Sequence, residues 1–298
     1  MPAIEYFDNL KIEMVGRDGS YWCVSGPGMA EQGVFMLPNP QGIYDAEFKT
    51  LFVPGPFGDE YVGKRSQKRE MIIPLYVYAD DPHTWRTIDA QLRWAFDYDE
   101  LATIYVTTAD GTRWLKVRMQ EAPKYTYEKN PHLLSENPVV YTFAAEFPFW
   151  QDDPVETVWE TLNTQDLHRF HVENPGDIPV WLKWTLTDRA LWTLPDFSWG
   201  NDMYSRGEQD RGRTIPLPEL KAGEDIEVDS DPRVQTIIAA NSSPVQHRWK
   251  GNDLLYPLMP GKHGEIPVQV KNAEFGGALK LTVPRWFSRP WSHPWAIL

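Results

Sequence analysis

One stretch of this chain repeats its apolar residues at helical spacing, and the rest consists of short β-rich runs broken by proline and glycine. The apolar residues of that stretch lie on one helical face. They are Trp85, Ile88, Leu92 and Phe96, with Ala95 beside them. Asp80 or Asp81 can cap the helix, and Pro82 suits its first position. We therefore expect a core helix over residues 82–97, and strands elsewhere.

The first half of the chain carries strand signals on both sides of this helix. The expected strands cover residues 21–24, 48–53, 70–78, 101–107, 113–119 and 139–147. Pro74 should lie at a sheet edge or a bulge because proline has no N–H to donate. Asp110-Gly111 is typical of a tight hairpin turn, whereas residues 25–63 are rich in Pro/Gly loops. This order predicts an α+β domain on antiparallel sheet over residues 1–150.

The second half, residues 151–298, shows no convincing helical pattern after residue 154. Short strands with Gly/Pro turns between them are typical of an all-β sandwich. The expected strands cover residues 167–172, 180–187, 213–217, 224–229, 234–239, 245–250, 266–270 and 278–283.

Composition and motifs exclude several kinds of function. The formal net charge of −13 disfavours nucleic-acid binding, and no apolar run is long enough for membrane insertion. No secretory signal is visible at the N-terminus. The lone Cys23 excludes a disulfide framework, and no nucleophile, phosphate-binding or metalloprotease motif occurs. We predict no catalytic residue, metal or cofactor.

A basic cluster, Lys64, Arg65, Lys68 and Arg69, interrupts the acidic background. The cluster is a solvated loop or guards a strand edge, or else it contacts an acidic partner surface. We therefore name these four residues as candidate interface residues.

Tryptophans concentrate in the second half, where ten of the 14 lie at or beyond Trp150. Core and interface packing explains them, because aromatic rings bury much area; platforms for sugar rings are the rival explanation. The proline spacing of residues 284–295 excludes a helix there. We expect this segment to pack in an extended form on its own domain or a neighbouring subunit, with Trp286, Trp291 and Trp295 as candidate interface residues.

The order of these pieces resembles a known family. The strand ending Leu75-Tyr76-Val77-Tyr78-Ala79-Asp80 precedes the helix, and Phe147-Pro148-Phe149-Trp150 closes the first half. The segments 170–177 and 222–229 and the Pro260-Gly261 turn follow. Together they resemble the distal tail proteins of long, non-contractile-tailed bacteriophages, particularly minor tail proteins of phages of actinobacteria.

The resemblance implies a split-barrel-like N-terminal domain that closes into a homohexameric ring, and a galectin-like β-sandwich at the ring periphery. It also implies a non-enzymatic protein of the virion tail tip, assembled in the host cytoplasm. Its partners would be the tail tube protein, the tip hub or tape-measure protein, and other minor tail proteins. The galectin sugar-binding pattern is incomplete here, since His171 to Gly176 reads His-Val-Glu-Asn-Pro-Gly without the arginine.

Two other functions remain open from the residues alone. The C-terminal sandwich could act as a glycan-binding module or receptor-binding protein. Dispersed carboxylates could also meet in space as a glycoside hydrolase site.

Overall fold

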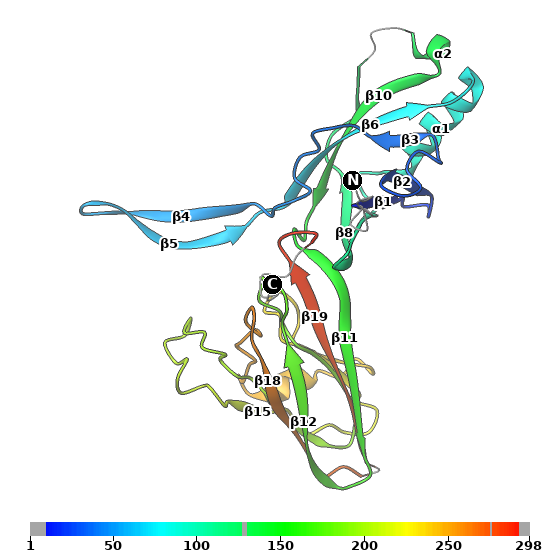
Figure 1. Ribbon diagram of the computed structural model, residues 1–298. Coiled ribbons are helices and arrows are strands. Elements are labelled where there is room, and N and C mark those ends of the chain that lie inside the picture. The colour runs from blue at the N-terminus through cyan, green and yellow to red at the C-terminus, as the bar shows by residue number, and fades with distance from the viewer. Residues whose placement is uncertain (1–9, 127–129, 275, 292–298) are drawn as a thin grey trace, which may run out of the picture. The chain divides into compact units, whose positions relative to one another are not determined.

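The computed structural model describes residues 10–126, 130–274 and 276–291 (Figure 1). These residues form two compact units. The first contains the described residues between 10 and 152 together with residues 287–291, and the second contains the described residues between 153 and 286. Strands dominate both units, as the sequence predicts.

The first unit is built on antiparallel strands in the order β2-β1-β7-β8-β10-β6-β3, with β9 beside β10. The strands are β1 (Lys11–Val15), β2 (Tyr21–Ser25), β3 (Val34–Met36), β6 (Arg69–Tyr78), β7 (Ala102–Thr108), β8 (Gly111–Met119), β9 (Lys124–Tyr125) and β10 (Glu136–Ala145). The turn predicted at Asp110-Gly111 joins β7 to β8, and Gly111 has a φ of 120°.

Helix α1 (Pro82–Ala95) packs on this sheet through the predicted face. The Asp81 side chain caps it by accepting two backbone N–H groups. Trp85 and Leu92 are buried, and Ile88 is half-buried against the same core.

The predicted helix end at residue 97 is wrong, because Phe96 already has extended backbone angles. Phe96 is buried edge-on against Tyr141 and Phe143 of β10, with ring centroids 5.5 and 5.0 Å apart. Aromatic packing on the sheet therefore replaces the last helical turn. A second, short helix, α2 (Pro131–Leu134), is a feature that the sequence reasoning missed.

Pro74 lies in the middle of β6 but next to the end of β3. Its carbonyl accepts the N–H of Leu37, one residue past β3. The chain that leaves β3 next pairs with β6 at an isolated bridge between Gln41 and Ile72. The prediction of an edge or bulge position for Pro74 is therefore wrong, because β6 lies between β10 and β3 and its register with β10 is continuous. The proline is tolerated at the point where the pairing with β3 ends.

Residues 48–66 form a long hairpin of β4 (Phe48–Gly55) and β5 (Gly58–Ser66). β4 agrees with the strand expected at 48–53, but the prediction of loop through residue 63 is wrong. Tyr61 pairs with Phe52 across the hairpin, so ladder hydrogen bonds order a stretch whose glycines look loop-like in sequence.

The second unit contains two antiparallel sheets, β12-β18-β14-β15 and β17-β16-β13-β19-β11. Buried side chains from both sheets form one hydrophobic core. The strands are β11 (Trp150–Thr161), β12 (Gln165–Glu173), β13 (Lys183–Leu186), β14 (Leu191–Pro195), β15 (Thr214–Pro216), β16 (Ile226–Asp229), β17 (Ile237–Ala239), β18 (His263–Lys271) and β19 (Gly277–Phe287).

The strand predicted at 245–250 is wrong, because Val245–Trp249 is a 3-10 helix. The turn buries Val245 and Trp249, and the Trp249 indole N–H donates to the Pro216 carbonyl at 2.8 Å. Tertiary packing of these two side chains therefore outweighs the strand pattern. β11 and β14 are further strands that the sequence reasoning missed.

Candidate interaction surfaces

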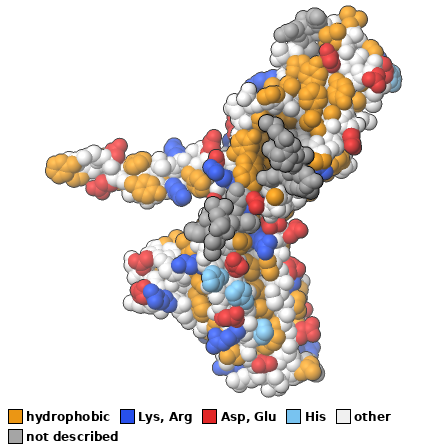
Figure 2. Space-filling view, in the orientation of Figure 1, with side chains coloured by type: hydrophobic (Ala, Val, Ile, Leu, Met, Phe, Trp, Pro, Cys, Tyr) orange, Lys and Arg blue, Asp and Glu red, His pale blue; other side chains and the backbone are white. Residues whose placement is uncertain are grey.

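The β4–β5 hairpin exposes an unusual amount of apolar surface (Figure 2). Among the described residues, its two strands pair only with each other. Its exposed apolar side chains are Phe48, Leu51, Phe52, Val53, Phe57, Tyr61 and Val62. An isolated hairpin is marginally stable in water, and contiguous exposed apolar surface marks an interaction site. The hairpin is therefore the first candidate for a contact with another molecule.

The tip of this hairpin presents one aromatic ring to solvent. Phe57 lies in the turn between Gly55 and Gly58 and is fully exposed. Gly58 has a φ of 122°, a backbone conformation that favours glycine. The turn thus holds Phe57 outward with no contact that would bury it in its own chain.

Charges are separated along the hairpin. Asp59 and Glu60 follow the tip, whereas Lys64 and Arg65 lie on β5 near its base. All four are exposed, and none forms an ion pair within the part of the chain that the structure describes. Lys64 lies over the Phe48 ring, 4.5 Å from its centroid.

The predicted basic cluster divides into exposed and buried members. Lys64 and Arg65 are exposed on β5, and Lys68 donates to the Gln120 side chain at 2.6 Å from an exposed position. Arg69, in contrast, is buried at the start of β6. The prediction of Arg69 as an interface residue is therefore wrong.

The Arg69 guanidinium binds four backbone carbonyls of its own chain and not a partner molecule. It donates to the carbonyls of Pro148 at 2.7 Å, Gly42 and Ile43 at 3.0 Å each, and Ser288 at 2.6 Å. Burial lowers the pKa of Arg69 to about 10, so the group stays charged near neutral pH. Arg69 thereby ties residues 42–43, the loop after β10 at Pro148 and the segment 287–291 into the first unit.

The outer face of α1 forms a groove with β2 and the loop before β3. The groove has a volume of about 900 Å³, and Tyr21, Trp22, Ile88 and Trp94 give it apolar walls. Trp94 is exposed and carries the Arg17 guanidinium 4.3 Å from its ring centroid. This groove is the second candidate surface of the first unit.

The candidate tryptophans near the C-terminus differ in their surroundings. Trp286 is half-buried against the core of the second unit, with Arg233 5.9 Å from its ring centroid. Trp291 is half-buried in the first unit, 5.0 Å from the Tyr44 ring. Trp295 lies outside the described residues.

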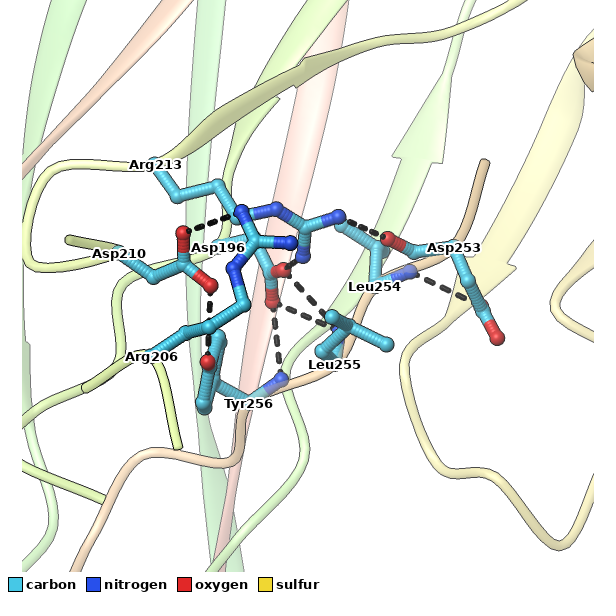
Figure 3. Close-up of polar contacts among 8 residues, drawn as sticks. All are labelled: Asp196, Arg206, Asp210, Arg213, Asp253, Leu254, Leu255 and Tyr256. Atoms are coloured by element: carbon cyan, nitrogen blue, oxygen red, sulfur yellow. Dashed lines mark hydrogen bonds and ion pairs between the residues drawn. The ribbon is translucent and has the colours of Figure 1, made fainter. Parts of the chain in front are cut away.

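A buried polar network in the second unit connects the loop after β14 to residues 253–256 (Figure 3). The Asp196 carboxylate accepts the N–H groups of Leu255 and Tyr256 at 3.0 Å and pairs with Arg213. Asp210 accepts the Tyr256 hydroxyl at 2.8 Å. Burial raises the pKa of Tyr256, and the hydrogen bond to Asp210 raises it further. Sequence reasoning missed this network because its members lie up to 60 residues apart.

The network stabilises loops and has no free acid–base pair. Each of its two carboxylates accepts hydrogen bonds from groups fixed in the fold, which is typical of structural polar clusters. Among residues 10–126, 130–274 and 276–291, no group of three or more His, Cys, Asp or Glu side chains could hold a metal ion. In the same residues, no helix is both long and apolar enough to cross a membrane.

Two histidines of β12 and an aspartate after β16 have local partners. His168 stacks on Trp159, with centroids 5.1 Å apart, and the His171 Nδ1 lies 3.3 Å from the Glu265 carboxylate. Asp231 accepts the backbone N–H and the guanidinium of Arg233. Asp231 therefore takes part in the local hydrogen bonding of a turn.

Comparison with known proteins gives relatives over nearly the whole chain. No protein-family model matches it. The chain is 26% identical over 338 aligned positions to Minor tail protein Gp27 of Mycobacterium phage D29, covering 96% of this chain and 98% of the relative. Minor tail protein Gp27 of Mycobacterium phage L5 is likewise 26% identical, over 342 positions and the same shares of both chains.

A solved structure shares the fold. The SPP1 Dit protein, described as a paradigm of the hub adsorption apparatus in phages that infect Gram-positive bacteria, superposes with a TM-score of 0.57 at 13% identity. The match covers 91% of this chain and 98% of that one. The resemblance to minor tail proteins of actinobacterial phages is thereby confirmed, and the chain is similar to structural proteins of phage tails.

Proposed function

We propose, from this similarity to phage minor tail proteins, that the chain is a structural component of the virion tail tip. In this proposal, identical copies close into a ring, which we expect to be a homohexamer, assembled in the host cytoplasm. The ring joins the tail tube protein to the tip hub or tape-measure protein and to other minor tail proteins. The observation that carries the proposal is the 26% identity over 96% of the chain.

The first unit is the proposed ring-forming domain, with a split-barrel-like sheet. Its support is the β4–β5 hairpin, whose apolar side chains need a cover that the described chain does not supply. A contact between two different patches of identical copies is heterologous, and it closes into a ring when the rotation between copies allows it.

The second unit is the proposed galectin-like sandwich at the ring periphery, joined to the first near residue 150. The two sheets around one core support this assignment. The geometry at Asn174 argues against sugar binding by the galectin pattern. Its amide is buried, donates to the carbonyls of Ile178 at 2.9 Å and Leu258 at 3.0 Å, and accepts the Gly176 N–H at 3.0 Å. The buried amide uses both of its N–H groups within the fold, so glycan binding through this pattern is disfavoured.

Three measurements test the proposed function. Light scattering of the purified full-length chain should give a mass several times that of a protomer, and negative-stain electron microscopy should show rings. Antibody labelling of virions should mark the distal tail tip. A monomer at every concentration, together with virions unlabelled at the tip, would contradict the proposal.

A further inference from the structure

The first unit carries two unfilled surfaces that complement each other. One is the hairpin tip with the outward Phe57, and the other is the groove between α1 and β2. Phe57 is fully exposed, so it does not occupy the groove of its own chain. We infer that the hairpin tip of one copy docks in the α1–β2 groove of a second copy. This inference rests on the proposed ring function and names the contact that closes the ring.

The apolar parts of the two surfaces match. The groove of about 900 Å³ has room for an aromatic ring and the prolines beside it, Pro54 and Pro56. Docking would cover Phe57 on the tip together with Trp94, the most exposed tryptophan side chain of the groove wall. Burial of two aromatic surfaces supplies the main attraction, as it does at the centres of protein interfaces.

Gly33 lets the loop before β3 approach α1 closely beside the groove. It has a φ of 72°, and a Cβ atom at this position would lie 2.6 Å from Ile88 Cδ1 and 2.7 Å from the Tyr78 carbonyl oxygen. Any side chain at Gly33 would therefore collide with the groove wall. The loop before β3 approaches α1 this closely only because the residue is glycine.

The two surfaces also offer one pair of opposite charges. The tip carries Asp59 and Glu60, while Arg86 lies on the groove side of α1 and forms no ion pair in the described chain. The groove also carries the acidic side chains of Asp18 and Glu31, so we expect the ion pair between the two copies at Arg86.

Site-specific disulfide formation tests the contact directly. Two full-length variants, Phe57→Cys and Gln91→Cys, are mixed with different tags and oxidised mildly. Gln91 lines the groove on α1, and the native Cys23 is buried. Because each variant carries only one of the two introduced cysteines, a disulfide between these two cysteines can form only between different copies of the chain. We expect the mixed product at least about tenfold above that from Phe57→Cys with the exposed control Thr112→Cys.

Equal or absent cross-linking at Gln91 and Thr112 would overturn the inference. The oligomer mass of the unmodified protein distinguishes a failure of this contact from a failure of the proposed ring function. Rings without the Gln91 cross-link would leave the proposed function standing and remove this contact, and the absence of rings would count against the function itself.

A charge-reversal cycle gives a second test. Glu60 and Arg86 are both exposed, so their substitution should not disturb folding, which circular dichroism would verify. Glu60→Arg and Arg86→Glu should each weaken self-association about tenfold in sedimentation velocity, and the double variant should recover most of the loss. A double variant no better than the single variants would contradict the pairing of tip and groove.

Discussion

Replacement of the buried Arg69 by methionine should destabilise the first unit far more than the same change at its neighbour Arg65. Arg69 donates to four backbone carbonyls, of Gly42, Ile43, Pro148 and Ser288. Methionine fills similar space and leaves these carbonyls without their donor. Arg65 is exposed and belongs to the same basic cluster, so it provides a matched control.

The magnitude follows from the individual contacts. Hydrogen bonds to a charged group contribute about 1.5–3 kcal/mol each, which for four bonds gives about 6–12 kcal/mol before desolvation. Removal of a buried charge returns several kcal/mol of desolvation cost, and the Ile43 carbonyl keeps the Trp150 indole N–H at 3.1 Å. We therefore expect a loss of about 3 kcal/mol for Arg69→Met. Arg65→Met should change the free energy of unfolding by less than about 0.5 kcal/mol.

The assay must read the first unit separately, because two-unit chains need not unfold in one step. Hydrogen exchange along a urea titration, followed on peptides of β6 and β10, gives this local free energy. Peptides of β18 serve as the internal control. Arg69→Lys should restore little, since one ammonium group cannot span carbonyls that a planar guanidinium bridges. Equal costs for Arg69→Met and Arg65→Met would refute the assignment of Arg69 as a structural tie.

Three further outcomes are expected. Leu92→Ala should cost about 2–5 kcal/mol in the first unit because Leu92 is fully buried, whereas exposed Leu133→Ala should cost under about 0.5 kcal/mol; an unchanged urea midpoint for the former would contradict the core position of α1. Tyr256→Phe should cost about 1–2 kcal/mol in the second unit by removing the donor to Asp210, measured on β18 peptides. Burial favours a higher pKa for Asp231, but the hydrogen bonds and charge of Arg233 outweigh it and leave the pKa below its usual range. This pair therefore stabilises the second unit above about pH 4 and loses that contribution as the pH falls further. Asp231→Asn should flatten the dependence of the second unit's unfolding free energy on pH below about pH 4. An unchanged dependence on pH would argue against the pair.

The elements that were predicted correctly depend on signals within about ten residues. The Trp85–Leu92 spacing and the cap at Asp81 specify α1 through contacts along about two helical turns. Asp110-Gly111 specifies the β7–β8 hairpin because the turn needs a glycine at positive φ. The helix end was misplaced because Phe96 packs on β10, whose Tyr141 lies far along the chain.

The candidate surfaces depended on tertiary structure. In sequence, Phe57 looks like one more apolar residue in a Pro/Gly-rich loop, and only the structure shows that no core receives it. The groove is likewise invisible in sequence, because α1 and the loop at Gly33 meet only in the folded unit.

The sequence by itself determined the strand-rich class, the single long helix and the likeness to phage tail proteins, because periodicity, turn chemistry and motif order are local properties of a chain. Tertiary structure alone decided which polar and apolar side chains face solvent. Arg65 and Arg69 stand four residues apart in one basic cluster, yet only Arg69 binds backbone carbonyls, and these belong to residues 26 to 219 positions away. A buried charge needs such partners, and no local pattern specifies where the fold will bring them.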